Sequence, residues 1–376
     1  MNVDNIKEEY LPYYYWMHTI PGVGNKRIAK FLNIWQNPIA FYEAGSTGWK
    51  EMLSEKWAEV IFSHKKDWNI EKNWEKLQIE KIEIIPKYHH LYPKQLLQIY
   101  DPPEILYAKG NRIELSNPSV AIIGARLCSP YGAYMAKDLG SALAFAGITV
   151  VSGMARGVDG IAQQAALDTG GYSIGILGCG VNVCYPKDNQ KLYYDLINRG
   201  CLLSELPPNT VPKAGFFPLR NRIISGLSDV VAVIEAREKS GTVITVDQAL
   251  EQGREVYALP GRVTDELSMG CNKLIKQGAG ILLNSQEFLQ DIYGIIAVKD
   301  KNEGISAKKS EIDTFGEKII SCLDIQLLSL DEILERLQKM SFGSEISYSK
   351  LMECLLQLVA KGLVIEEENY YRKRML

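Results

Sequence analysis

Arginine and small residues recur in the loops that follow a series of apolar, β-branched runs. A small side chain lets a ligand approach the backbone closely, and the planar guanidinium group of arginine offers paired donors to phosphate oxygens. If the runs are parallel strands, these loops meet at one edge of a sheet, and we expect an anion to bind along that edge. The loops are GAR (124–126), SGMARG (152–157), GCGVN (178–182), SELPP (204–208), EAREKSGT (235–242) and PGR (260–262).

Two of these loops lead directly into segments with helix-start signals. Ser129-Pro130 follows the first loop, and Ser240-Gly241-Thr242 closes the fifth. Such helix starts leave free backbone amides pointing outward, where they can bind an anion. The glycine spacing is neither that of a dinucleotide site nor that of a Walker loop, and no histidine follows His90 to complete a Ser-His-Asp set. The edge therefore favours binding over catalysis, and we predict no catalytic residue.

The runs themselves indicate the fold that positions these loops. Apolar strands that alternate with helix-length segments are typical of a parallel sheet covered on both faces. We therefore predict an α/β fold, an extended Rossmann-like, doubly wound and mainly parallel sheet, over residues 106–298. The runs are SVAIIGA (119–125), ITVVSGMA (148–155), YSIGILGCG (172–180), CLLSEL (201–206), DVVAVIEA (229–236), EVYALPG (255–261) and GILLNS (280–285).

A separate helical domain is predicted over residues 1–105, which hold all six tryptophans. Within it, TIPGVGNKRIAKFL places Gly22 and Gly24 where a tight turn needs positive φ, followed by Asn25 as an N-cap. This spelling resembles a helix-hairpin-helix turn, as found in helical SAM-type or helix-hairpin-helix domains. The turn either holds a DNA phosphate or only joins two helices.

The C-terminal part follows a polar linker, predicted over residues 299–311. Residues 312–376 show helical stretches at 313–324, 330–340 and 346–361, and then a short β-wing, LVIEEENYYRKRM. We predict a winged-helix-like domain. Because its wing carries Glu366, Glu367 and Glu368, it favours packing or protein binding over phosphate contact.

Composition limits the classes of protein that fit. The 376 residues are 46% hydrophobic and 23% charged with a net charge of -3, so an anion site must be a local patch. The N-terminus shows no signal segment, and no apolar run is long enough for a membrane helix. We expect a cytoplasmic protein without membrane contact. The seven cysteines contain no CxxC pair, which indicates reduced thiols, and we predict neither a metal nor a cofactor.

Several longer motifs closely resemble the DNA-processing protein A family, also called Smf. They are SGMARGVDGIAQQAAL, GILGCGVNVCYPKDNQKLY, SELPP, FFPLRNRIISGLSDVVAVIEAREKSGTVITVDQALEQGREVYALPG and SMGCNKLIKQGA, which together cover about 170 residues in the family's order. The resemblance implies a non-enzymatic protein that binds single-stranded DNA as a homodimer through the Rossmann-like domain. It also implies that the protein protects incoming DNA and loads the RecA recombinase onto it. Natural transformation, general recombination and defence against foreign DNA are alternative settings for that activity.

The resemblance also assigns residues to the DNA contact. Arg220 and Arg222 would face the strand, so that glutamates at both positions would abolish binding and leave the fold intact. Phe217 would either stack on a base or pack in the core. Lys213, Arg237 and Lys239 are either additional cations of the patch or ordinary solvated side chains. The residues predicted to contact DNA are Gly124, Arg126, Ser152, Gly153, Lys187, Phe217, Arg220, Asn221, Arg222, Ser240, Gly241, Thr242 and Lys273.

This chain departs from the family pattern at Gln163, where a histidine is common, and Gln163 cannot carry a titrating charge. Asp159 is retained and is expected to cap the following helix. Two other functions are alternatives. A hydrolase of nucleotide N-glycosidic bonds would need a glutamate after a glycine pair, whereas here the loop EAREKSGT is followed by Asp247. A sensor of small nucleotides would bind a mononucleotide and not an oligonucleotide.

Overall fold

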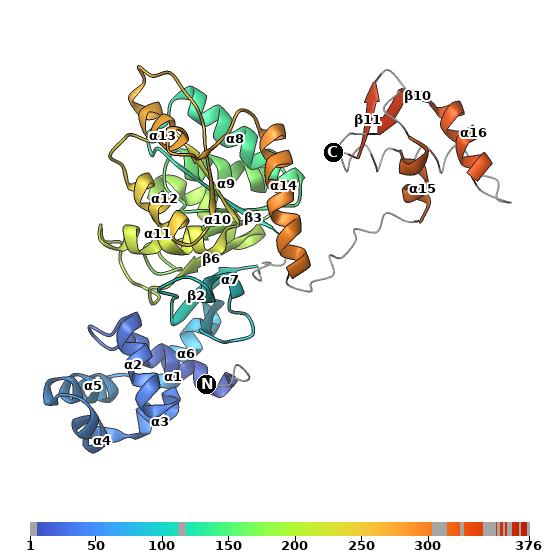
Figure 1. Ribbon diagram of the computed structural model, residues 1–376. Coiled ribbons are helices and arrows are strands. Elements are labelled where there is room, and N and C mark those ends of the chain that lie inside the picture. Colours follow the sequence, from blue (N-terminus) through green and yellow to red (C-terminus); the bar gives the residue numbers. More distant parts are fainter. Residues whose placement is uncertain are drawn as a thin grey trace. The chain divides into compact units, whose positions relative to one another are not determined.

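The computed structural model describes residues 6–111, 118–302, 314–323 and 327–340, together with residues 351, 354, 355, 358, 363–367 and 370–373. The chain forms two compact units, Met1–Ile295 and Ile296–Leu376. Each unit is described here by itself (Figure 1).

The first unit is built on a nine-stranded sheet in the order β1-β2-β6-β5-β4-β3-β7-β8-β9. Strands β3 to β9 pair in parallel, whereas β1 pairs with β2 and β2 with β6 in antiparallel fashion. The predicted α/β class and mainly parallel sheet are therefore confirmed. The strands are β1 (Ile82–Pro86), β2 (Ile105–Gly110), β3 (Ser119–Gly124), β4 (Thr149–Ser152), β5 (Ser173–Ile176), β6 (Cys201–Ser204), β7 (Val230–Ile234), β8 (Glu255–Ala258) and β9 (Gly280–Ile281).

All seven predicted runs contain a strand, β3 to β9, but β1 and β2 were not predicted. They add two antiparallel strands next to β6, at one end of the sheet. Because β2 spans Ile105–Gly110, the domain boundary predicted at residue 105 falls at the start of a sheet strand. The helical region before it lies in the same compact unit as the sheet.

The direction of winding reverses at β3, which pairs with β4 on one side and with β7 on the other. At their carboxyl ends, Gly124 of β3 lies opposite Ile234 of β7. In open α/β sheets, such a switch point separates the loops that follow the two strands and leaves a crevice between them. The topology therefore places the loops after β3 and β7 around one crevice.

The helices cover the sheet in two groups, as right-handed crossovers require (Figure 1). Helix α8 packs against α9 and α9 against α10, whereas α11 packs against α12 and α7. Helix α11 crosses back from β6 to β7, so it lies over the switch point. These helices are α7 (Lys94–Leu97), α8 (Pro130–Phe145), α9 (Val158–Asp168), α10 (Gln190–Arg199), α11 (Phe216–Leu227), α12 (Gly241–Glu251), α13 (Glu266–Lys276) and α14 (Ser285–Asn302), with the short 3-10 helix η2 (Lys187–Asn189) before α10.

The N-terminal helices enclose an aromatic core in which Trp16, Phe41 and Trp49 are fully buried. The same cluster includes Tyr107 of β2 and Val181, so it packs onto the end of the sheet. Its helices are η1 (Glu8–Tyr10), α1 (Leu11–Thr19), α2 (Asn25–Trp35), α3 (Pro38–Glu43), α4 (Gly45–Met52), α5 (Glu55–Asp67) and α6 (Ile70–Ile79).

The turn between α1 and α2 matches the glycine expectation only in part. Gly22 has φ 78°, but Gly24 has φ -133° and is the N-cap of α2. Asn25 is the first helical residue and not the cap. Its side-chain amide group donates to Asp101 Oδ1 at 3.0 Å and to the Pro102 carbonyl at 2.9 Å. Asn25 thus ties the turn to the loop before β2. The resemblance to a helix-hairpin-helix domain stays a prediction.

The second unit has a core formed by Ile319, Leu337, Leu351 and Tyr371. Helices α15 (Thr314–Cys322) and α16 (Leu330–Met340) lie within two predicted helical stretches, whereas most of the third, 346–361, is outside the described residues. A three-stranded sheet pairs β10 (Leu328–Ser329), β12 (Tyr370–Lys373) and β11 (Val364–Glu367) in that order. The winged-helix-like assignment stays a prediction.

Helix α14 extends to Asn302, so the linker predicted at 299–311 begins within a helix, and its residues from 303 on are outside the described residues. Within the described part of the chain, we find no helix both long enough and apolar enough to cross a membrane.

Candidate functional site

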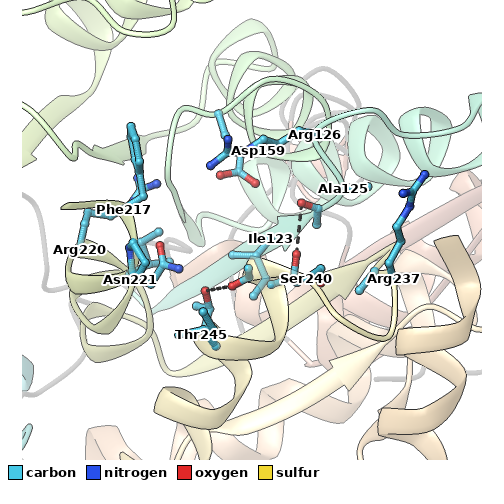
Figure 2. Close-up of a pocket in the computed structure, with 18 of the residues that line it drawn as sticks. Ile123, Ala125, Arg126, Asp159, Phe217, Arg220, Asn221, Arg237, Ser240 and Thr245 are labelled. Carbon is cyan, nitrogen blue, oxygen red and sulfur yellow. Dashed lines mark hydrogen bonds between the residues drawn. The ribbon is translucent and has the colours of Figure 1, made fainter. Parts of the chain in front are cut away.

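A pocket of about 660 Å³ lies at the carboxyl ends of β3 and β7, at the switch point (Figure 2). Most of its lining comes from the β3–α8 loop, from α11, and from the β7–α12 loop with the start of α12. Ala155, Asp159 and Tyr185 add to the lining from the segments after β4 and β5. In Figure 2, Phe217 and Asn221 lie on one side, Arg237 and Ser240 on the other. The predicted residues that line the pocket are Gly124, Arg126, Phe217, Arg220, Asn221, Ser240, Gly241 and Thr242.

An aromatic pair forms one wall of the pocket. The half-buried ring of Phe217 stacks on Tyr185, with centroids 5.6 Å apart and planes inclined by 30°. The guanidinium group of Arg126 lies 5.6 Å from the Phe217 centroid, close enough for a cation–π interaction. A Cβ atom at Gly178 would lie 2.8 Å from the Phe217 ring, so glycine is needed behind it. Phe217 is therefore packed on one side and open to the pocket on the other.

Tyr185 was missed by the sequence analysis, although it is 41% exposed and lines the pocket. It lies in the segment Val183-Cys184-Tyr185-Pro186, which has no strand or helix pattern. Its place beside Phe217 depends on a contact between residues 32 positions apart in the chain, which the sequence alone does not indicate.

Arg220 lies at the floor of the pocket and is only 6% exposed. Its Nη1 donates to the Gly153 carbonyl at 2.8 Å and also to the Ile176 carbonyl, so the guanidinium group joins the ends of β4 and β5. Burial lowers the pKa of Arg220 to about 10, although the nearby Asp159 charge opposes this shift. Arg220 thus holds the strand ends in place, and replacing it with glutamate would disturb the fold, contrary to the expectation from sequence.

Asp159 is 7% exposed and lies in the first turn of α9, whose N-cap is Gly157. Its Oδ2 accepts a hydrogen bond from the Gly153 amide at 3.1 Å. Burial raises the pKa of Asp159, while Arg220 and the hydrogen bonds to its carboxylate oppose that rise. The expectation that Asp159 caps its helix is therefore wrong: the side chain fixes the β4–α9 loop, which precedes the helix.

Ser152 and Gly153 lie behind the pocket wall and not in it. The Ser152 hydroxyl donates to the Ile122 carbonyl at 2.6 Å, between neighbouring strands. A Cβ atom at Gly153 would lie 2.4 Å from Arg220 Nη1, so the glycine makes room for the guanidinium group. Both residues thus support the pocket lining without contacting the pocket.

Arg222 points away from the pocket, because it lies two residues after Arg220 on α11. Its Nη2 lies 2.5 Å from Glu205 Oε2 and its Nε 3.5 Å from Asp101 Oδ2. The side chain is about one-tenth exposed. Arg222 is thus part of an ion-pair network beneath α11, and a glutamate there would face two carboxylates. We therefore expect a glutamate at Arg222 to destabilise the fold, which differs from the expectation from sequence.

The predicted lysines are exposed and lie outside the pocket lining. Lys187 begins η2, close in sequence to Tyr185, and Lys273 pairs with Glu238 at 2.7 Å. Arg237 is exposed, lines the pocket and lies 3.5 Å from Glu266. Lys213 and Lys239 are exposed. Arg126 and Arg237 are thus the exposed cations among the described lining residues.

The two helix starts predicted to bind anions differ in the structure. At α8, the carboxylate of Glu235 accepts hydrogen bonds from the Ser129 amide at 2.8 Å and from the Ser129 hydroxyl, so an internal anion occupies this site. The expectation of free amides at α8 is therefore wrong. Glu235 reaches α8 because its backbone is left-handed, with φ 55°.

At α12, Ser240 is the N-cap but its side chain makes no capping bond. The first amides of a helix have no acceptor within it. Gly241 and Thr242 line the pocket at that point, and the Thr242 hydroxyl donates to the Gly124 carbonyl at 3.5 Å. Helix α12 therefore presents its positive end to the pocket.

Gln163, in place of the family histidine, is fully buried. Its Oε1 accepts from the Met154 amide at 3.0 Å, and its Nε2 donates to the Ile174 carbonyl at 3.0 Å. Gln163 thus braces β4 against β5. Asp247, the carboxylate that follows the EAREKSGT loop, is exposed on α12 and is not among the described residues that line the pocket.

Comparisons with known proteins agree with this fold. Residues 83–293 match the family model described as DNA recombination-mediator protein A. The DNA processing protein DprA of Bacillus subtilis is 41% identical over 212 residues, which are 56% of this chain and 71% of that one.

Two solved structures are also similar. DNA processing protein A from Streptococcus pneumoniae superposes with a TM-score of 0.65 at 34% identity, covering 74% of this chain and 97% of that one. The Helicobacter pylori protein, whose structure concerns its single-stranded DNA binding mode, gives a TM-score of 0.53 at 33% identity over 57% of this chain and 96% of that one. The motifs, the mainly parallel sheet and these similarities lead to one assignment: the chain belongs to the DNA recombination-mediator protein A family, the DNA-processing protein A family that its motifs resemble.

Proposed function

We propose that this protein binds single-stranded DNA in the switch-point pocket and acts as a recombination mediator that protects incoming strands and loads RecA onto them. The observation that carries the proposal is the pocket itself. It combines the stacked rings of Phe217 and Tyr185 with exposed cations, Arg126 and Arg237, and with the positive end of α12. The relative from Helicobacter pylori supports the choice of ligand.

These groups fit a strand without reading its sequence. Bases of any type can stack on an aromatic ring, while arginine and helix amides attract phosphates. A duplex hides the faces of its bases, so the aromatic wall favours single strands. We expect a site of about 4–16 nucleotides, as in comparable grooves.

The finer parts of the proposal extend the family resemblance. We propose a homodimer formed through the Rossmann-like domain, a RecA partner, a cytoplasmic location and no enzymatic step. The buried environments of Asp159 and Arg220 are consistent with a binding role, because both groups are held by bonds to the strand-end loops.

A free mononucleotide is the competing ligand, since a pocket of about 660 Å³ lies in the size range of small-molecule sites. The test is fluorescence anisotropy of a labelled oligothymidine at three salt concentrations, with duplex DNA and a mononucleotide as competitors. We expect single-strand preference and a linear fall of log affinity with log salt, at a slope of about -0.7 per contacted phosphate. Displacement by the mononucleotide alone, without oligonucleotide binding, would contradict the proposal.

A further inference from the structure

A second cavity, of about 340 Å³, lies among α8, α9 and α10. Lys137 of α8 and Lys191 of α10 lie on its walls, and Gly157 forms part of the wall that faces the switch-point pocket. None of these residues was among the predicted contacts. We call this cavity the α8–α10 groove.

The α8–α10 groove is separated from the switch-point pocket by a single layer of backbone. A Cβ atom at Gly157 would lie 2.3 Å from the Ala125 carbonyl oxygen and 2.6 Å from that of Arg126, and both residues line the pocket. The Val158 amide also donates to the Ala125 carbonyl at 3.2 Å. The two cavities are therefore neighbours that share the wall formed by residues 125–126 and 157.

The second wall that they share is formed by the loops around Ala155 and Asn189. Ala155 lines the pocket and Asn189 lines the groove. The Asn189 Nδ2 donates to the Met154 carbonyl at 3.0 Å and to the Ala155 carbonyl at 2.9 Å, which fixes the two loops together. Arg156 and Lys187 lie within these loops and are both exposed. Exposed cations thus lie at the wall that the pocket and the groove share.

The charged residues that line the groove are Lys137 and Lys191, with Asp168 and Asp188. Arg156, Lys187, Arg199 and Asp195 lie next to these residues in the chain or pair with them.

Each of these carboxylates already has a cationic partner. Asp188 pairs with Arg156, Asp168 with Arg199 at 3.5 Å, and Asp195 with Arg199 at 3.0 Å and Lys191 at 4.0 Å. No ion-pair partner within 4.0 Å is found for Lys137 or Lys187 among the described residues. Lys137 and Lys187 thus remain available to an anionic ligand.

We infer that the α8–α10 groove binds the continuation of the same DNA strand, by its phosphates, after the strand passes Arg126, Arg156 and Lys187. This inference rests on the proposed function. A chain of phosphates is the ligand that would need two adjacent basic cavities joined by exposed arginines, because a free mononucleotide is too short to occupy both. The aromatic pocket would hold bases, and the groove would hold backbone.

The test uses the full chain with Lys137→Glu and Lys191→Glu combined, and two labelled oligothymidines of about 6 and about 20 nucleotides. For the longer strand we expect at least about tenfold weaker binding and a salt slope less steep by about 1.4, which corresponds to two lost phosphates. Binding of the shorter strand should not change. The control is Lys56→Glu with Lys66→Glu, which makes the same change of charge on exposed positions of α5.

Unchanged binding of the longer strand would overturn the inference while leaving the proposed function intact. Equal losses for both strands, or the same loss in the α5 control, would also overturn it, because either result reflects net charge and not a second site. If the wild-type chain bound neither strand, the proposed function itself would fail. Should the glutamate pair not fold, the Lys137→Gln and Lys191→Gln pair replaces it. It removes the same two cations, so the same length dependence and a change in slope of about 1.4 are expected, with a smaller loss of affinity.

Discussion

At the scale of single residues, the side chains of the pocket fall into two groups. Some are accessible to a ligand, and others are buried and support the walls. Phe217 and Arg126 are accessible, whereas Arg220 and Asp159 are buried and bonded to the ends of β4 and β5. All four residues lie in the sequence motifs quoted above, but the motifs do not reveal this division. Substitutions can separate binding from stability on that basis.

Phe217→Ala should weaken binding of an oligothymidine by about five- to 150-fold, because one stacked base contributes about 1–3 kcal/mol. The measurement is anisotropy at fixed salt. Phe216→Ala is the matched control: its side chain is half-buried on the same turn of α11 but is not part of the described pocket lining. Equal losses in both variants would show that the effect comes from disturbing α11.

Arg220→Met should lower the free energy of unfolding by about 1.5–3 kcal/mol, because it removes the charged hydrogen bonds to the buried Gly153 and Ile176 carbonyls. Urea denaturation measures this loss. Arg237→Met provides the contrast: the side chain is exposed, so stability should change by less than about 1 kcal/mol while DNA affinity falls. A stable Arg220→Met protein with poor DNA binding would instead place Arg220 in direct contact with the strand.

At the scale of elements, the sequence predicts strands well and side-chain direction poorly. Five of the parallel strands, β3 to β7, are fully or almost fully buried, so each leaves a clear apolar run, whereas β8 and β9 are only partly buried. β1 comes soon after a lysine- and glutamate-rich helix and contains Glu83 and Pro86, so its apolar residues do not form a separate run. Arg220 and Arg222 lie on one helix, and only the packing of α11 shows that they point to different buried networks.

The contact between α1 and β2 gives this unit a dependence on pH. His18 of α1 is buried, and its Nδ1 lies 3.0 Å from the Tyr107 hydroxyl on β2. Burial lowers the pKa of His18 from 6.5 to about 4. Because the unfolded chain binds this proton more tightly, the contribution of His18 is fully present above pH 6.5 and is lost as the pH falls towards 4.

Urea denaturation at pH 7.5 and at pH 5.0 tests this linkage. Between these values His18 should remove about 2 kcal/mol from the free energy of unfolding, at about 1.4 kcal/mol per pKa unit. His18→Gln keeps a hydrogen-bonding side chain without a titrating charge, so its stability should depend less on pH by that amount. Identical pH dependence in the His18→Gln variant would contradict the assignment.

At the scale of the whole molecule, both cavities described above belong to the first unit. With a net charge of -3, the chain as a whole does not attract DNA, so binding must depend on where its cations lie. Every residue that lines the switch-point pocket or the α8–α10 groove precedes residue 296, which is where the second unit begins. In the second unit, the β-wing predicted from sequence carries an exposed Glu366, which would repel phosphate.

A chain that ends at Asn302 should therefore bind oligothymidine within about twofold of the full chain, with an unchanged salt slope. It keeps the whole sheet and all of α14, so the strand-end loops retain their supports. Anisotropy on both proteins under identical salt makes the comparison, with circular dichroism to confirm that the shortened chain is folded. A drop of tenfold or more would mean that the second unit contacts the strand itself. Retained affinity would instead leave that unit free to bind another protein while DNA occupies the first.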